Sequence, residues 1–287
     1  MLVDFTNCKE ELCSYGGSEK KKKIIYNNQE YLLKFPDPVR EENMVLSYIN
    51  NVYSEYLGCK IFESIGIPVQ EVILGRYIEK DGKNKIVVAC KDFTTQNKQL
   101  LLFKAISNGE TTIDRHIRRD IEDVYHIIEE LPISNKQEII ESFWNIFVVD
   151  TLIGNPDRHL ENWGLLKDNN EYHMSPVYDC GSSLNPLLSE EKLKIIQESN
   201  QEFMNNAFNI HPVYKLHGKS LTYKEFYQEN INDLKISLKN IFPKIDLEKI
   251  NSIIDSVNEI SDLRKDYLKK SIEYRYKNIL LSVYKKL

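Results

Sequence analysis

The chain has 287 residues, of which 41% are hydrophobic and 28% charged, so it can bury a substantial core in one large domain or two modest ones. Only 11 glycines and 9 prolines argue against a linker-rich or disordered chain. The net charge of −5 does not favour a nucleic-acid-binding protein, which is usually basic, so we expect no nucleic-acid partner.

The N-terminal part of the sequence is predicted to be β-rich around a single helix. We expect strands over 22–26, 31–35, 70–77 and 85–89, and a helix over 45–64. Asn27-Asn28 lies between the first two predicted strands, and Asp81-Gly82 lies between the last two. Such residues tolerate the backbone geometry of tight turns, so each pair of strands is expected to form a hairpin. Gly66, followed by Pro68, is typical of the residues just after a helix.

After Phe93 the pattern changes to helical periodicity. We expect helices over 98–107, 112–130, 136–153, 189–199, 222–242, 246–259 and 262–286, and short strands near 163–166 and 173–176. This order predicts an α+β fold with two lobes, a small β-rich N-lobe at 1–92 and a larger helical C-lobe at 93–287.

The cysteines and the apolar segments bear on the compartment. Five cysteines without a Cys-x-x-Cys pair indicate reduced thiols rather than a disulfide framework or a zinc site. No apolar stretch approaches the ~20 residues that span a bilayer, and we find no signal peptide. We therefore expect a cytoplasmic protein without a membrane span, and export without a signal peptide stays open.

The segment 154–162 carries the most informative motif. Asp157 is followed by Asn162, and Asp179 lies beyond a predicted hairpin and just before Cys180-Gly181. Phosphoryl transfer needs a carboxylate that accepts the proton of the attacking hydroxyl, and further oxygen ligands that hold Mg²⁺ against the nucleotide. Each residue alone could be a turn or cap residue, but the joint order favours catalysis. Asp157 is the expected base, Asn162 and Asp179 are the expected metal ligands, and Gly181 would let the backbone turn sharply.

Upstream residues complete a nucleotide site. Gly16, Gly17 and Ser18 precede the first predicted hairpin as a phosphate-covering turn, although a lone Gly-Gly pair is a weak signal. Lys34, a charged residue in an apolar strand, is the expected nucleotide lysine, and Glu55 on the following helix is its expected partner. An exposed lysine and a solvent-facing carboxylate are the alternatives. The lysine run 20–23 fits a solvated hairpin edge better than a specific site, and a contribution to phosphate attraction stays open.

These motifs together resemble the HipA-like serine/threonine kinases. The resemblance rests on 154–162, on Asp179-Cys180-Gly181, on 16–20 and on 33–36. It implies a protein-kinase-like fold, ATP and Mg²⁺ as cofactors, and a protein substrate with serine or threonine. It also implies autophosphorylation at Ser14 or Ser18, next to the glycine pair. The hinge that binds adenine through its backbone would consist of Cys90, Lys91, Asp92 and Phe93.

Some features depart from eukaryotic kinases and leave alternatives open. The order Asp157-Arg158-His159 replaces His-Arg-Asp, and no Ala-Pro-Glu segment follows Gly181. The same string also resembles the catalytic loop of phosphoinositide kinases, in which the histidine is catalytic. His159 could therefore share the proton transfer with Asp157 or support the loop. A phosphoinositide or small-molecule kinase and a non-catalytic, nucleotide-binding pseudokinase stay as alternative functions.

Overall fold

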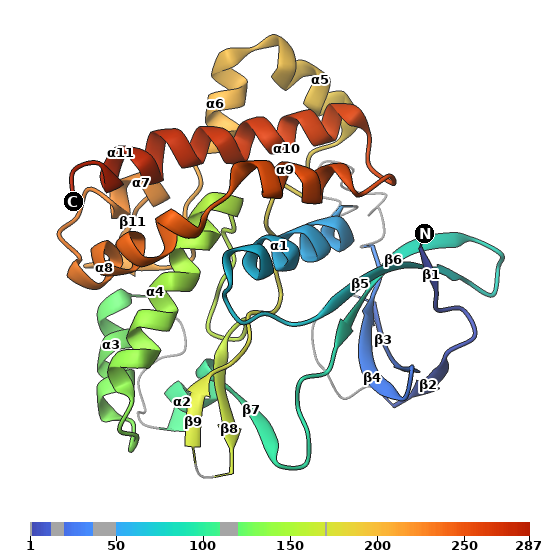
Figure 1. Ribbon diagram of the computed structural model, residues 1–287, viewed down its shortest axis with the longest axis horizontal. Helices are drawn as coiled ribbons and strands as arrows, with labels where there is room; N and C mark the ends of the chain where they lie inside the picture. Colours follow the sequence, from blue (N-terminus) through green and yellow to red (C-terminus); the bar gives the residue numbers. More distant parts are fainter. Residues whose placement is uncertain (1, 13–19, 37–49, 110–119, 170) are drawn as a thin grey trace.

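The computed structural model describes residues 2–12, 20–36, 50–109, 120–169 and 171–287. The described chain has an α+β fold, with a curled sheet at one end of the molecule and helices at the other (Figure 1). The predicted fold class is therefore confirmed. None of the helices in the described residues is long and apolar enough to cross a membrane.

The N-terminal sheet has six strands in the order β1-β5-β6-β4-β3-β2. The strands are β1 (Val3–Asp4), β2 (Lys9–Glu11), β3 (Lys21–Tyr26), β4 (Gln29–Lys34), β5 (Val72–Ile78) and β6 (Asn84–Lys91). Asn27 and Asn28 turn between β3 and β4 with φ of 49° and 60°, and Gly82 turns between β5 and β6 with φ of 83°. Both predicted hairpins are present because their turn residues adopt the left-handed conformation.

Both faces of the central strand β6 are buried. Val87 and Ala89 face a small apolar cluster that includes Phe5 and Phe35, whereas Val88 and Cys90 face the main core. Alternate residues of a strand point to opposite faces, so the continuous apolar run 86–90 suits a strand that is covered on both sides.

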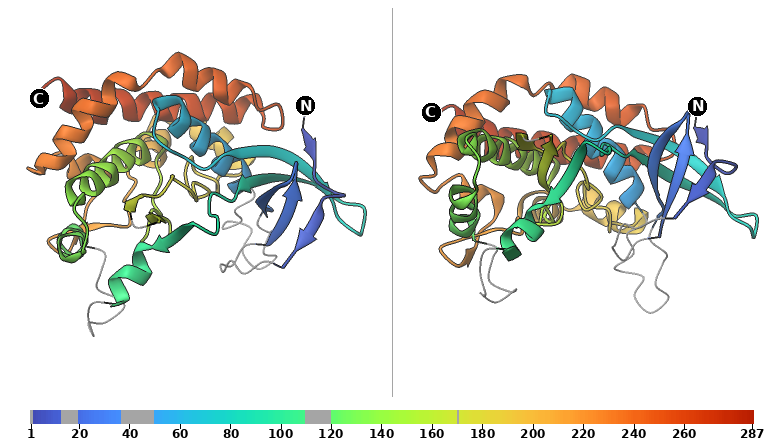
Figure 2. Two further views of the ribbon diagram at one scale, coloured as in Figure 1. Left: turned by 60° about the horizontal axis from the view of Figure 1, so that its bottom comes forward. Right: turned by 90° about the horizontal axis from the view of Figure 1, so that it is seen from below.

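Helix α1 (Asn51–Ile65) packs against the sheet on the main-core side and also contacts α9 (Figure 2). It ends at Gly66, which adopts the left-handed conformation with φ of 83°, as predicted. The predicted start of this helix lies outside the described residues. Gly58 faces the segment that carries Cys180, and a β-carbon on Gly58 would lie 2.6 Å from the β-carbon of Cys180. The glycine therefore allows a close approach between α1 and that segment.

The helical part is built around α4 (Lys136–Ile153), whose residues from 146 to 153 are all buried. The other helices of this part are α2 (Phe103–Gly109), α3 (Ile121–Glu130), α5 (Glu190–Glu198), α6 (Asn200–Phe208), α7 (Tyr223–Phe226), α8 (Asn232–Ile241), α9 (Leu247–Asp255) and α10 (Asp262–Arg275). A 3₁₀ turn (Phe242–Lys244) follows α8, and a π-helical segment (Tyr276–Leu281) joins α10 to α11 (Ser282–Tyr284).

Two small sheets complete this part. The strands β7 (Lys98–Leu102), β8 (Gly164–Asp168) and β9 (Glu171–Met174) are antiparallel, and β10 (Lys215–Leu216) pairs with β11 (Lys219–Ser220). The β8–β9 hairpin follows the segment 154–162, which itself follows α4. The two segments with the predicted catalytic residues are thus held by a buried helix and a hairpin.

Two of the predicted helices differ from the structure, and one helix of the structure was not predicted. Residues 98–102 form strand β7, because its backbone pairs with β8, as in the pair Leu100 and Leu166. The predicted helix 222–242 is interrupted after α7, and the extended backbone at Ile231 begins α8. The short helix α6 was not predicted, because its sequence is mostly polar and lacks a clear apolar periodicity. It begins after Ser199, whose side chain accepts a hydrogen bond from the Glu202 amide.

Candidate active site

The loop with Asp157 begins where α4 ends. Gly154 adopts the left-handed conformation with φ of 63°, and its amide donates to the Asp150 carbonyl. Asn155 donates through Nδ2 to Asp150 Oδ1 at 3.0 Å, and Asn155 Oδ1 accepts from the Asp157 amide at 3.1 Å. The Asn155 side chain therefore fixes the start of the loop to the buried helix.

Asn162 closes the same loop. Its Nδ2 donates to the Asp157 carbonyl at 2.8 Å, and its backbone amide donates to the His159 carbonyl at 2.8 Å. This hydrogen bond uses the side-chain nitrogen of Asn162. The side-chain oxygen, the atom that could bind Mg²⁺, takes no part in it. Asp157 Oδ2 itself accepts a hydrogen bond of 3.4 Å from the Ser182 hydroxyl.

His159 is held by its own loop. Its Nδ1 accepts a hydrogen bond from the Glu161 amide at 3.2 Å, and the same nitrogen lies 4.0 Å from Glu161 Oε2. About a third of the side chain is exposed. This contact favours the supporting interpretation of His159 that the sequence left open.

A network of three charged residues joins the two parts of the molecule. Lys34 Nζ lies 2.8 Å from Asp179 Oδ1 and 3.2 Å from Glu55 Oε2, and the Asp179 amide donates to Glu55 Oε1 at 3.2 Å. The exposed fractions of the side chains are 8% for Lys34 and 1% for Glu55, but 36% for Asp179. The structure thus brings together three predicted site residues from a strand, a helix and the segment after β9, and Asp179 faces the open side.

The charges of this network are mutually stabilised. Burial by itself would lower the pKa of Lys34, but the carboxylates of Asp179 and Glu55 hold that pKa well above its ordinary value. Burial would raise the pKa of Asp179, but the charge and hydrogen bond of Lys34, with further help from Lys21 and Arg158, lower it to about 2. Lys34 is therefore protonated and Asp179 ionised at neutral pH.

The sharp turn at this segment lies at a different residue from the one predicted. Asp179 itself adopts the left-handed conformation, with φ of 58°, whereas Gly181 does not have a positive φ. Aspartate enters this region more readily than most residues because it is short and polar. A β-carbon on Gly181 would lie 3.4 Å from Glu55 Oε2, an ordinary van der Waals contact, so Gly181 lies directly beside the Glu55 carboxylate.

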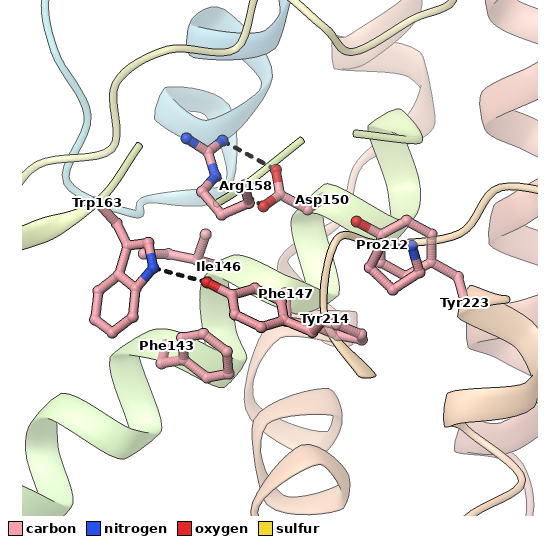
Figure 3. Close-up of a pocket in the computed structure, with 9 residues that line it drawn as sticks. All are labelled: Phe143, Ile146, Phe147, Asp150, Arg158, Trp163, Pro212, Tyr214 and Tyr223. Atoms are coloured by element: carbon pink, nitrogen blue, oxygen red, sulfur yellow. Dashed lines mark hydrogen bonds and ion pairs between the residues drawn. The ribbon is translucent and has the colours of Figure 1, made fainter. Parts of the chain in front are cut away.

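Arg158 connects the two segments that carry the predicted catalytic residues. Its Nε and Nη2 contact the two carboxylate oxygens of Asp150 at 2.9 Å and 3.0 Å (Figure 3). Its Nη1 donates to the carbonyls of Asn162 at 3.2 Å and Asp179 at 3.3 Å, and also to the Tyr178 carbonyl. Burial disfavours the charge, yet Asp150 holds the pKa of Arg158 well above its ordinary value. Arg158 thereby sets the position of Asn162 relative to Asp179.

Sequence reasoning missed Asp150 and Arg158 as site residues. The available signal was Asp150 itself, a charged residue within the apolar run 146–153 of α4, in which every residue is buried. The cavity that the pair borders holds only about 10 Å³, and Tyr214 accepts a hydrogen bond from Trp163 Nε1 at 2.7 Å on its far side (Figure 3). This space is too small for a substrate, so these side chains support the loop from behind.

The predicted hinge residues lie at the end of β6 and just after it. The Lys91 amide donates to the Glu71 carbonyl at 2.9 Å, and the Asp92 amide donates to the Glu30 carbonyl at 2.8 Å. Cys90 points into the core, where its Sγ lies 3.9 Å from Glu55 Oε1. The backbone amides of Lys91 and Asp92 are therefore already engaged by neighbouring carbonyls.

The Phe93 ring lies 5.9 Å from the ring of Tyr178, the residue before Asp179. Tyr178 was also missed by the sequence analysis, although its place beside a metal-ligand candidate was visible. The predicted glycine turn, with Gly16, Gly17 and Ser18, and the proposed modification site Ser14 lie outside the described residues.

Comparison with known proteins places this chain among the protein kinases, as predicted. The chain belongs to the HipA-like C-terminal domain family, whose model matches residues 13–260. It is 36% identical to the serine/threonine-protein kinase CtkA of Helicobacter pylori strain J99, over 97% of this chain and 86% of that protein. The resemblance to HipA-like kinases is thereby confirmed.

Solved structures agree with this assignment. The crystal structure of the Helicobacter pylori proinflammatory kinase CtkA superposes with a TM-score of 0.89 at 34% identity, and the match covers 100% of this chain and 97% of that one. HipA from Shewanella oneidensis MR-1, solved with HipB and operator DNA, matches with a TM-score of 0.56 at 13% identity. That match covers 98% of this chain and 68% of that one, and shows the shared fold.

Proposed function

We propose that this protein is an ATP- and Mg²⁺-dependent protein serine/threonine kinase. The observation that carries the proposal is the network of Lys34, Glu55 and Asp179, which joins a strand lysine to a carboxylate on the open side. In kinases of known mechanism, a lysine–glutamate pair and a metal-binding aspartate must both be in place for transfer. The name of the curated relative supports the same activity.

The donor set fits Mg²⁺ bound together with a nucleotide. No cluster of three or more His, Cys, Asp or Glu side chains that could hold a metal occurs within the described residues. Mg²⁺ is usually held by one or two carboxylates plus substrate phosphates, so a site with few protein ligands is what this chemistry expects. Asp179 and Asn162 would supply the oxygens, and the metal would neutralise phosphate charge when bound.

The residues of the chain divide the remaining work. Lys34 would bind the nucleotide phosphates, and Glu55 would keep its ammonium group in position. Asp157 would accept the proton of the substrate hydroxyl as the phosphoryl group passes to that oxygen and ADP leaves. Arg158 would maintain the position of Asp179 relative to the loop with Asn162. The rings of Phe93 and Tyr178 offer an aromatic surface for the adenine ring of the nucleotide.

We also infer that the two lobes are 1–92 and 93–287. Strand β6 ends at Lys91, and β7, which begins at Lys98, already pairs with the sheet of the helical part. A cleft between such lobes is where a kinase holds its nucleotide.

We further propose autophosphorylation at Ser14 or Ser18, and a cytoplasmic location with possible export.

The first test is transfer of labelled phosphate from ATP with Mg²⁺ to a generic protein substrate. We expect transfer by the wild-type protein, and a loss of at least 100-fold in Asp157→Asn, because a positioned base typically contributes ~10²–10⁴-fold. A matched control is Asp168→Asn, a half-buried aspartate of β8 paired with Lys98 at 2.9 Å, which should keep full activity.

Two outcomes would favour the other functions. Transfer to phosphoinositide vesicles but not to protein would favour the lipid kinase. ATP binding without transfer to any acceptor, including the protein itself, would favour the pseudokinase. Mass spectrometry after incubation with ATP tests Ser14 and Ser18, and absence of phosphate from both would contradict autophosphorylation there.

A further inference from the structure

Arg275 on α10 is a buried arginine that pairs with no carboxylate in the described part of the chain. It is 1% exposed, and burial lowers its pKa to about 10, so the guanidinium is still charged at neutral pH. An uncompensated buried charge is strongly destabilising. Groups other than a carboxylate must therefore offset the charge of Arg275.

Two helix ends supply this compensation, because α10 packs against both α4 and α6 (Figure 1). Arg275 Nε donates to the Leu152 carbonyl at 2.8 Å, in the last turn of α4. Its Nη1 donates to the Ala207 carbonyl at 3.2 Å, in the last turn of α6. The last carbonyls of a helix have no partner within the helix, and they form the negative end of its dipole. One guanidinium therefore caps two helices.

The end of α4 is also where the loop with Asp157 begins. The Arg275 guanidinium lies against Gly154, the first residue after α4, because a β-carbon on Gly154 would come within 3.1 Å of Arg275 Cζ. Leu152, whose carbonyl Arg275 contacts, precedes Asp157 by only a few residues along the backbone. A shift of the guanidinium would therefore move the start of the loop that carries the candidate base.

A second buried arginine of α10 makes different contacts. Arg264 is 4% exposed, and it pairs with Glu190 Oε1 at 3.1 Å and donates to the Leu188 carbonyl. A carboxylate thus offsets the charge of Arg264, and these contacts lie at the start of α5 and just before it. The guanidinium of Arg275 is instead bonded to helix carbonyls, which favours a role in fixing the ends of α4 and α6.

We propose that Arg275 is a positioning residue for phosphoryl transfer, which holds the end of α4, and through it Asp157, in the place that the reaction requires. This inference rests on the proposed function. Because Arg275 is buried, it acts through the backbone and not by contact with a substrate. A misplacement of about 1 Å can cost ~10²-fold in rate. The nucleotide contacts assigned to Lys34 and Asp179 lie elsewhere, so the transfer step should be affected rather than ATP binding.

The test compares the two buried arginines of α10 in the assay with labelled ATP. We expect Arg275→Met to lower kcat at least tenfold, while KM for ATP stays within twofold of wild type. Arg275→Lys keeps the charge and a donor for one of the two carbonyls, so it should retain at least a third of the wild-type kcat. Arg264→Met removes a guanidinium of similar burial from the same helix and should keep kcat within twofold. Circular dichroism at the assay temperature checks that each variant is folded, and Arg275→Gln replaces Arg275→Met if the latter does not fold.

A double-variant cycle tests whether Arg275 acts through Asp157. Once Asp157→Asn has removed the base, Arg275→Met should lower kcat no further, because residues that act as a unit are not additive. Additive losses would overturn the inference. Wild-type kcat in Arg275→Met, a rise in KM alone, or an equal kcat loss in Arg264→Met would overturn it as well, with the proposed function intact. Absence of transfer by the wild-type protein would instead reject the proposed function, and the inference with it.

Discussion

Removal of the Arg158 guanidinium should destabilise the fold strongly. In Arg158→Met the buried Asp150 carboxylate, 1% exposed, loses both contacts to the guanidinium. Breaking a buried ion pair by removing one partner typically costs about 3–5 kcal/mol, because the remaining charge is left uncompensated. The carbonyls of Asn162, Tyr178 and Asp179 lose their donor too. We expect a loss of about 4 kcal/mol, a large part of the roughly 5–15 kcal/mol typical of a domain.

Urea unfolding would measure this loss, with the dependence of the unfolding free energy on urea concentration compared between variants. The matched control is Arg76→Met, because Arg76 pairs with Asp4 at 2.8 Å but is 47% exposed, and exposed pairs contribute only about 0–1 kcal/mol.

A double-mutant cycle separates the ion pair from packing. Arg158→Met and Asp150→Asn should each destabilise, and the double variant should lose about 1–3 kcal/mol less than the sum of the two, as expected for residues in direct contact. Arg158→Met within 1 kcal/mol of wild type, or an additive double variant, would refute the reasoning that Arg158 holds the loop through Asp150.

Three further predictions concern the network and its surroundings. Glu55→Gln removes one of the two carboxylates near Lys34, and it should lower kcat/KM in the phosphate-transfer assay at least tenfold; unchanged kinetics would contradict the assigned role. Asp179 has a pKa of about 2 in the folded protein, below the ~3.9 of an unfolded chain, so its stabilising effect is full above about pH 4 and is lost as the pH falls toward 2. Urea unfolding from pH 7 to pH 3 should therefore show a wild-type advantage over Asp179→Asn of roughly 1–2 kcal/mol that shrinks in acid, after allowance for the 36% exposure of the side chain; a constant difference would refute it. Gly58→Ala should destabilise by about 1–3 kcal/mol in thermal unfolding, because the contact of 2.6 Å with Cys180 outweighs the gain of up to ~1 kcal/mol in helix propensity; a stabilised variant would show that α1 can shift at no cost.

The parts of the fold that the sequence predicted are those encoded locally. The turn at Asn27-Asn28, the end of α1 at Gly66 and the whole of α4 follow from turn chemistry, capping and apolar periodicity. Strand β7 was misassigned as helix because an apolar run of this length fits either period. Its partner β8 lies far along the chain, and only that pairing decides between them.

The candidate site divides in the same way. Asp157, Asn162 and Asp179 could be chosen as candidates because phosphoryl transfer fixes which groups it needs and in which order, and their roles stay predictions. Arg158 could not, because its contacts join the loop to carbonyls on the segment after β9, and nothing local marks an arginine that bonds backbone oxygens. The left-handed backbone at Asp179 was missed for a related reason, since Gly181, two residues further on, is the residue that local preference favours.

Helix α1 contacts both parts of the molecule through one face. Glu55 contacts Lys34 of the sheet, and Gly58, about one helical turn further along the same face, packs against Cys180 of the helical part. The Asp179 amide donates to the same Glu55 carboxylate, so one buried side chain on α1 contacts both the sheet and the segment with the candidate metal ligand Asp179. A displacement of α1 must therefore disturb the position of Lys34 and of Asp179 together. Because both are required for transfer in the proposed mechanism, any ligand or modification that shifts α1 would change activity with no direct contact to the nucleotide.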